Sequence, residues 1–158
     1  MKRPQTTVIL AMTVDGKIAD YQRSAARFGS QADKKHLEKQ ISLSDAVLMG
    51  AGTLRAYQTS LVITDPELLQ SRQHRHHPPQ PIHIICSASG NLNPQWRFFN
   101  QPLPRWLLTT PSGAQVWEEL NTTGFERILI NDTIKTAQKP QINWITAFSQ
   151  LSDLGIAN

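Results

Sequence analysis

The stretch Asp45-Ala46-Val47-Leu48-Met49-Gly50-Ala51-Gly52-Thr53 decides the fold class. Its apolar residues 46–49 follow one another without polar alternation, which is typical of a central parallel strand covered on both faces. The run ends at two closely spaced glycines, where a tight turn leads into a new helix. The stretch therefore predicts a strand–turn–helix unit of an α/β domain.

The same format recurs along the chain. Apolar runs predict further strands at 7–12, 82–86, 105–109 and 127–130. Helical spacing predicts helices at 31–43, 114–120 and 144–154. Ser30 and Asp33 form a capping box for the first helix, and Gly155 is placed to cap the last. Strands that alternate with helices predict a three-layer α/β/α domain with a largely parallel sheet.

Length and composition narrow the function classes. The 158 residues suffice for one domain, and 39% hydrophobic with 18% charged residues is a globular composition. The net charge of +4 is too scattered for a nucleic-acid surface, so no nucleic-acid partner is expected. No apolar segment approaches a signal sequence or a membrane span in length. We therefore expect no membrane partner and a cytoplasmic location.

Two features bear on metal binding and thiol chemistry. The single cysteine, Cys86, lies in an apolar run, where we expect a buried and inert side chain. The stretch 72–77 holds three histidines and runs into Pro78 and Pro79, which predicts a solvated loop between two structured elements. Because no cysteine or carboxylate stands beside these histidines, we expect no metal site.

Open α/β sheets bind ligands beyond the carboxyl ends of their strands, so three strand ends form the candidate site. The first, 11–19, contains Asp15 and Lys17 around Gly16. A carboxylate there can accept ribose hydroxyls or take part in proton transfer. An ordinary Asp-Gly surface turn is the alternative.

The second and third strand ends suit phosphate. At 50–55, backbone amides at a helix start and the Thr53 hydroxyl can meet an anionic oxygen, and Arg55 adds positive charge. The run 86–90 consists of residues with small side chains, two of which carry hydroxyl groups. The 50–55 segment has neither a Walker nor a Rossmann glycine pattern, so a plain strand-to-helix turn is its alternative.

In order and spacing, the runs 11–19, 45–53 and 80–87 resemble the reductase domain of riboflavin biosynthesis, a family with the dihydrofolate reductase architecture. The resemblance implies a dihydrofolate reductase-like fold and an NADPH-dependent reductase of a phosphoribosylaminopyrimidine, similar to 5-amino-6-(5-phosphoribosylamino)uracil reductase. Hydride would go to C1′ of the ring-opened ribose. It also implies NADPH as cofactor, a pyrimidine ribosyl phosphate as substrate and a homodimer.

The resemblance assigns roles to individual positions. Asp15 matches the family's Asp-Gly at the junction of cofactor and substrate. We expect this candidate catalytic residue to orient or polarise the reacting molecules. The candidate cofactor-binding residues are Ala11, Phe28, Gly50, Gly52, Thr53 and Ser87. Among them, Ser87 corresponds to a position near the adenosine 2′-phosphate. The candidate substrate-binding residues are Thr13, Lys17 and Leu61.

The chain departs from the family pattern mainly on the substrate side. Ile9 and Ile41 replace a lysine and an arginine of many members, and Tyr57-Gln58-Thr59 replaces the usual Asp-x-Pro. We also expect the single domain 1–158 to lack the family's C-terminal strands and its triple-glycine turn at the cofactor pyrophosphate. These departures keep a non-catalytic nucleotide-binding or regulatory module open as the alternative. Dihydrofolate reductase itself is a weaker one, because its Trp-x-x-x-x-[DE] pattern does not follow the first predicted strand.

Overall fold

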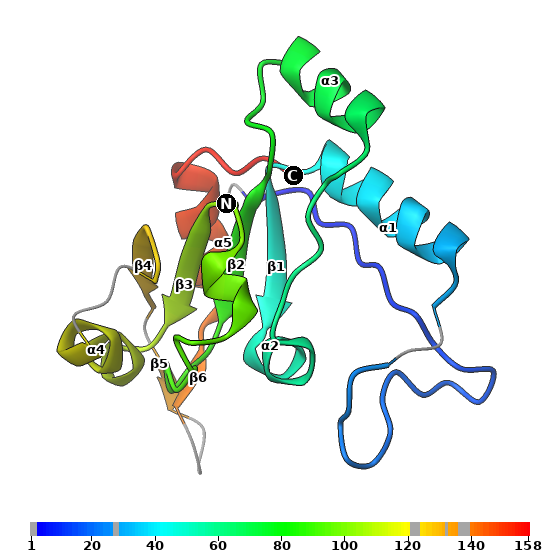
Figure 1. Cartoon of the computed structure of the whole chain (residues 1–158). Helices are drawn as coiled ribbons and strands as arrows, with labels where there is room; N and C mark the ends of the chain where they lie inside the picture. The colour runs from blue at the N-terminus through cyan, green and yellow to red at the C-terminus, as the bar shows by residue number, and fades with distance from the viewer. Residues whose placement is uncertain (1–2, 27–28, 121–123, 132, 136–139) are drawn as a thin grey trace.

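The computed structural model describes residues 3–26, 29–120, 124–131, 133–135 and 140–158, with backbone alone at 133–135 and 140. Its main sheet has four strands in the order β1-β2-β3-β4, and all neighbours are parallel (Figure 1). The strands are β1 (Ala46–Gly50), β2 (Ile82–Cys86), β3 (Arg105–Thr109) and β4 (Arg127–Ile130). The α/β architecture and these four predicted strands are confirmed.

The connections supply the helices. The segments before and within the sheet are α1 (Gln31–Leu43), α2 (Ala51–Tyr57), α3 (Pro66–His74), the 3-10 helix η1 (Arg97–Asn100) and α4 (Pro111–Leu120). After the sheet come the antiparallel strands β5 (Thr133–Lys135) and β6 (Pro140–Ile142), and then α5 (Trp144–Asp153). Helix α1 matches its predicted bounds, whereas α4 begins earlier than expected, at Pro111, because proline is well suited to the first turn of a helix.

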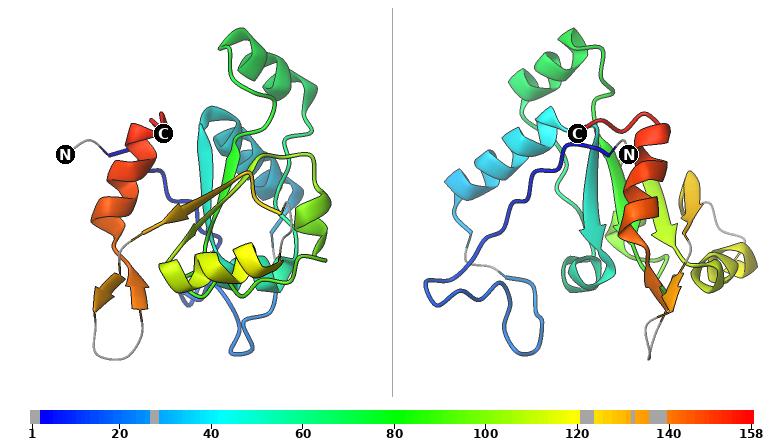
Figure 2. Two further views of the ribbon diagram at one scale, coloured as in Figure 1. Left: turned by 90° about the vertical axis from the view of Figure 1, so that its left-hand side faces the viewer. Right: turned by 180° about the vertical axis from the view of Figure 1, so that it is seen from behind.

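The two faces of the sheet have separate cores, as continuous apolar strands require. On one face, Ile84 and Leu108 pack with Ala147 and Leu151 of α5. On the other face, the buried side chains come from the sheet, α2, η1 and α4 and include Leu54, Ile85, Phe98, Leu107 and Trp117. Figure 2 shows α5 on one side of the sheet and α2 and α4 on the other.

The stretch 72–77 corrects the prediction of a solvated loop. Helix α3 extends through His74, and Arg72 is only 1% exposed. The Arg72 guanidinium donates to the carbonyl oxygens of Ser42 (2.9 Å), Ser44 (2.8 Å) and Pro78 (2.7 Å). A guanidinium at the C-terminal carbonyls of α1 complements the helix dipole, so this arginine holds α3 against α1. Burial lowers the pKa of Arg72.

The run 7–12 also departs from the prediction, because it forms no strand. Val8, Leu10 and Met12 are 73%, 66% and 63% exposed. Among the described residues, the backbone of this run bonds to no strand, and the nearest link is the Gln5 amide donating to the Ala157 carbonyl at 2.8 Å. The predicted common edge therefore unites the ends of β1, β2 and β3 but not Met12. In the part of the chain that the structure describes, no helix is long and apolar enough to span a membrane.

Candidate functional site

The carboxyl ends of the strands meet at one edge of the sheet, which appears at the bottom of Figure 1. Gly50 of β1 is in register with Cys86 of β2, and Cys86 is in register with Leu108 of β3. The segment 87–91, which we call the β2 loop, follows directly and begins with the Ser87 amide donating to the Leu108 carbonyl at 3.0 Å. Two of the three predicted strand ends, 50–55 and 86–90, therefore lie on neighbouring strands.

Side chains from β3, from α4 and from Thr110 between them hold the β2 loop. The Thr109 hydroxyl donates to the Ser87 carbonyl and the Thr110 hydroxyl to the Ala88 carbonyl, both at 2.6 Å. The Trp117 indole donates to the Gly90 carbonyl at 2.8 Å. Sequence reasoning did not assign these partners, although two hydroxyl residues before Pro111 are the usual start of a strand-to-helix junction. The donors fix the loop by turning its carbonyl oxygens toward the protein.

Two glycines bring the β2 loop and α4 into close contact. Gly90 has a φ of +63°, and a Cβ there would lie 2.2 Å from the Gly113 carbonyl oxygen. A Cβ on Gly113 would lie 2.0 Å from the Thr109 hydroxyl. Neither position has room for a side chain, so this junction requires glycine at both.

The predicted cofactor residues of the β1–α2 junction lie at the same edge. Gly50 is the N-cap of α2, and Gly52 and Thr53 are exposed in its first turn. A Cβ on Gly50 or Gly52 would meet no atom within 4 Å. The Arg55 guanidinium then links α2 to the β2 loop by donating to the Asn91 carbonyl at 3.2 Å.

The predicted substrate and catalytic residues form a separate turn. The Thr13 amide donates to the Lys17 carbonyl at 2.9 Å, and the Asp15 carboxylate accepts from the Thr13 hydroxyl and pairs with Lys17. These hydrogen bonds, the one to Lys17 first, hold the pKa of Asp15 below its ordinary value. The turn is exposed and joins the segment that runs away from the sheet (Figure 1). The structure therefore does not bring Asp15 to the edge formed by β1 and β2.

The remaining predicted residues have varied surroundings. Ala11 is exposed on the N-terminal segment, and Leu61 is half-buried in the connection between α2 and α3. Phe28 lies outside the described residues. Ser87 is only 4% exposed, whereas Ser89, two residues further along the loop, is exposed. The hydroxyl that the β2 loop presents to solvent therefore belongs to Ser89.

Two titratable groups lie on β2: His83 is buried, whereas Cys86, expected to be buried, is half-buried. Burial raises the pKa of Cys86 to about 12, which keeps this thiol protonated and unreactive at neutral pH, as expected for an inert cysteine. Burial, followed by the positive charge of Arg105, lowers the pKa of His83 to about 4. The His83 Nδ1 lies 2.8 Å from the Ser60 hydroxyl. Among the described residues, no cluster of histidine, cysteine and carboxylate groups is arranged to hold a metal ion.

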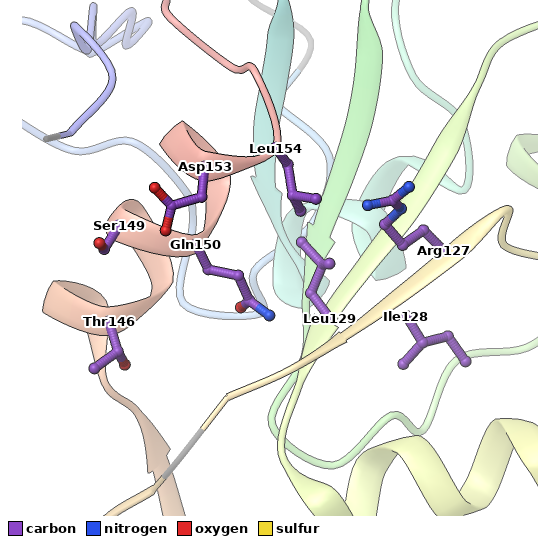
Figure 3. Close-up of a pocket in the computed structure, with 8 residues that line it drawn as sticks. All are labelled: Arg127, Ile128, Leu129, Thr146, Ser149, Gln150, Asp153 and Leu154. Carbon is purple, nitrogen blue, oxygen red and sulfur yellow. The ribbon is translucent and has the colours of Figure 1, made fainter.

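Two hollows flank the sheet. The larger, of about 650 Å³, is an open groove between β4 and α5, where Gln150 points from α5 toward Leu129 of β4 (Figure 3). It lies along the side of the sheet and contains none of the predicted site residues. The second, of about 490 Å³, lies at the ends of β1 and β2 and is lined by Gly50, Cys86, Ala88 and Trp144 among others. The second hollow therefore adjoins the candidate site.

The donors at this edge fit the phosphate groups of a nicotinamide dinucleotide. Thr53 and Ser89 supply exposed hydroxyls, and Arg55 supplies a guanidinium. Among the described residues, no carboxylate pairs with Arg55. Hydroxyl and guanidinium donors without a neighbouring anion suit phosphate oxygens.

Two solved structures have a similar fold. A diaminohydroxyphosphoribosylaminopyrimidine deaminase/5-amino-6-(5-phosphoribosylamino)uracil reductase of Thermotoga maritima matches with a TM-score of 0.68 at 20% identity, over 99% of this chain and 38% of that one. A pyrimidine reductase-like protein of Corynebacterium diphtheriae matches with a TM-score of 0.69 at 19% identity, over 92% of this chain and 60% of that one. These likenesses show a shared dihydrofolate reductase-like fold.

Sequence comparison identifies the family. A 2,5-diamino-6-ribosylamino-4(3H)-pyrimidinone 5′-phosphate reductase of Archaeoglobus fulgidus is 31% identical over 86 residues, which are 54% of this chain and 39% of the relative. The match therefore spans well under half of that relative's length. The family described as the RibD C-terminal domain matches residues 4–158. The chain belongs to the RibD C-terminal domain family, the pyrimidine reductase family of riboflavin biosynthesis.

Proposed function

We propose that this chain is an NADPH-dependent reductase of a phosphoribosylaminopyrimidine. The observation that carries the proposal is the shared carboxyl edge, where Thr53, Arg55 and the β2 loop present phosphate-binding groups on neighbouring strands. The substrate class rests on family membership and on the A. fulgidus relative, which is named as a reductase of a ribosylaminopyrimidine phosphate. The homodimer and the cytoplasmic location stay predictions.

NADPH, when bound, supplies the hydride for C1′ of the substrate ribose. The residues of the chain would bind and orient the two molecules, with Thr53 and the β2 loop on the phosphates of the cofactor. Asp15 is ionised at neutral pH, as an aspartate with an ordinary pKa already is, and the hydrogen bonds from Lys17 and Thr13 lower its pKa further. An ionised carboxylate accepts hydrogen bonds from ribose hydroxyls, so we assign Asp15 to orienting the substrate and not to donating a proton.

An assay of substrate turnover tests the proposed reductase activity. Purified chain is mixed with NADPH and either 2,5-diamino-6-ribosylamino-4(3H)-pyrimidinone 5′-phosphate or 5-amino-6-(5-phosphoribosylamino)uracil, and both NADPH absorbance and product mass are followed. We expect Asp15→Asn to lower kcat/KM by roughly 100-fold, because a substrate that is no longer oriented loses its near-attack geometry. Asp33→Asn, at an exposed position of α1, is the matched control and should leave kcat/KM unchanged.

A non-catalytic nucleotide-binding module is the second candidate. The observation that favours it is the isolation of the Thr13–Lys17 turn, whose hydrogen bonds are internal and do not reach the β2 loop. Binding of NADPH without reduction of either pyrimidine would support this candidate and contradict the reductase.

A further inference from the structure

Strand β1 forms one edge of the main sheet, because among the described residues no strand pairs with it on the side opposite β2. The Asp45 carbonyl accepts from the Ile82 amide at 3.0 Å, so the alternation of a parallel ladder directs the backbone groups of Ala46 and Leu48 outward. The Ala46 amide donates to the Asn158 carbonyl at 3.4 Å, whereas the outward groups of Leu48 bond to no described residue. This part of β1 is therefore free to pair with a further strand.

The β1 edge also lacks the features that usually block such pairing. Edge strands are commonly protected by charged side chains, by proline, by a bulge or by very short length. The five residues of β1 include no charged residue and no proline, and their register with β2 is continuous. The opposite edge strand, β4, has four residues and begins with the exposed Arg127. Of the two edges, β1 is therefore the unprotected one.

The run 7–12 has the sequence of a strand that fits such an edge. Its six residues are all exposed, and no residue from 4 to 14 is charged. Apolar, β-branched segments of this length without charge or proline readily add to an open sheet edge. The β1 edge and the run 7–12 thus match in chemistry, because both are apolar and uncharged and both have unpaired backbone groups.

Within one copy of the chain, the run 7–12 is directed away from the edge that it fits. The Gln5 amide donates to the Ala157 carbonyl at 2.8 Å, and the Asp45 amide donates to the Asn158 carbonyl at 2.9 Å. Residues 157 and 158 therefore lie between the start of the run and β1. Figure 1 shows the N-terminal segment diverging from β1 beyond this point. A run from a second copy can reach the outward groups of Leu48 without displacing these residues.

We propose that two copies of this chain exchange the run 7–12, each copy adding its run as a strand to the β1 edge of the other. The exchange is reciprocal, so the same two surfaces meet twice about a two-fold axis and both β1 edges become paired. Each copy contributes the run and the five residues of β1, roughly half of the 20–30 residues per side of a standard interface. We therefore expect a weak dimer with a dissociation constant on the order of 10 μM. In dilute solution single copies predominate, and their run 7–12 is exposed.

Light scattering after size-exclusion chromatography tests the association of the full chain. Wild-type mass should rise from one copy to two between about 1 μM and about 1 mM, a range that spans the expected dissociation constant. Leu10→Lys places a charge in each exchanged run and should raise the dissociation constant at least about tenfold, because lysine on an edge strand opposes pairing. Ile18→Lys adds the same charge at a 57% exposed position outside the run, and should change the constant less than about threefold. Circular dichroism checks that both variants are folded.

Hydrogen exchange followed by mass spectrometry identifies the surfaces that meet. Peptides covering 7–12 and 46–50 should exchange more slowly at high than at low protein concentration, and the Thr13–Lys17 turn should exchange at the same rate in both. In Leu10→Lys the difference for 7–12 and 46–50 should disappear at the same concentrations.

Three outcomes would overturn the exchange. They are a single copy at every concentration, a dimer that Leu10→Lys weakens no more than Ile18→Lys does, and protection of 7–12 that does not depend on concentration. The last result would mean that the run pairs within its own copy. The inference does not depend on the proposed reductase activity, because neither cofactor nor substrate takes part in the exchange.

Discussion

The four-stranded sheet and the N-terminal segment have similar apolar sequences but different backbone partners. The run 105–109 becomes β3 because β2 and β4 accept and donate its backbone hydrogen bonds on both sides. The run 7–12 is richer in apolar and β-branched residues than 105–109, yet among the described residues no strand pairs with it. An apolar run thus indicates that a strand can form, and a neighbouring strand determines that it does.

The largest expected effect separates these two regions directly. Leu107 of β3 is fully buried, so Leu107→Ala should lower the free energy of unfolding by about 2–5 kcal/mol through lost burial and a residual cavity. Leu10 is 66% exposed, and Leu10→Ala should change the free energy of unfolding by less than about 0.5 kcal/mol. Urea unfolding followed by tryptophan fluorescence measures both. Similar losses for the two variants would mean that the segment 7–12 packs like a strand of the sheet.

Sequence signals succeeded where the cause is local. Ser30 caps α1 by accepting from the Asp33 amide at 3.1 Å, and Gly155, with a φ of +87°, follows α5 as predicted. The glycine turn at 50–52 likewise marked the end of β1.

Local sequence signals did not predict the features that depend on residues distant in the sequence. Arg72 is buried where its guanidinium donates to the carbonyl oxygen of Ser42, which is 30 positions away in the sequence. The contact between Ser60 and His83 joins residues separated by 23 positions. The candidate site divides in the same way: the strand ends at 50–55 and 86–90 were predicted, but the donors that fix the β2 loop come from residues 109–117, which are distant in the sequence.

The next effect concerns the core of the sheet and depends on pH. His83 is 1% exposed on β2, and its pKa is lowered from 6.5 to about 4 by burial and then by Arg105. Below pH 6.5, His83 is protonated in the unfolded chain but stays neutral in the folded chain. The free energy of unfolding is therefore highest above pH 6.5 and falls as the pH is lowered toward 4. The loss should reach about 3 kcal/mol. No comparable group is described in the N-terminal segment.

Urea unfolding at a series of pH values checks this slope. His83→Gln should flatten the stability profile between pH 6.5 and 4.5, because glutamine does not titrate, whatever its effect on overall stability. His36→Gln, at an exposed position of α1, is the matched control and should keep the wild-type slope. A slope that survives the loss of His83 would assign the proton uptake to another group.

A smaller effect tests the close contact at the candidate site. Gly113→Ala should lower the free energy of unfolding by about 1–3 kcal/mol, because the new Cβ would lie 2.0 Å from the Thr109 hydroxyl and 2.7 Å from the Ala88 carbonyl oxygen. Gly52→Ala is the matched change at a helical glycine with open space, and should be neutral or stabilise α2 by up to about 1 kcal/mol. Thermal unfolding compares the two variants. Equal stability would show that the β2 loop and α4 can separate without cost.

The smallest expected effect lies in the N-terminal segment. Lys17→Ala should raise the pKa of Asp15 toward its ordinary value of 3.8, because the hydrogen bond from Lys17 is the main cause of the lowered value. The Thr13–Lys17 turn should persist, since its backbone hydrogen bonds, at 2.9 Å from Thr13 to Lys17 and from Gly16 to Thr13, do not involve the lysine side chain. NMR titration of the Asp15 carboxyl measures the pKa, and urea unfolding should show no change, because an exposed ion pair contributes little. A marked loss of sheet stability in Lys17→Ala would connect this turn to the core and remove the contrast between the two regions.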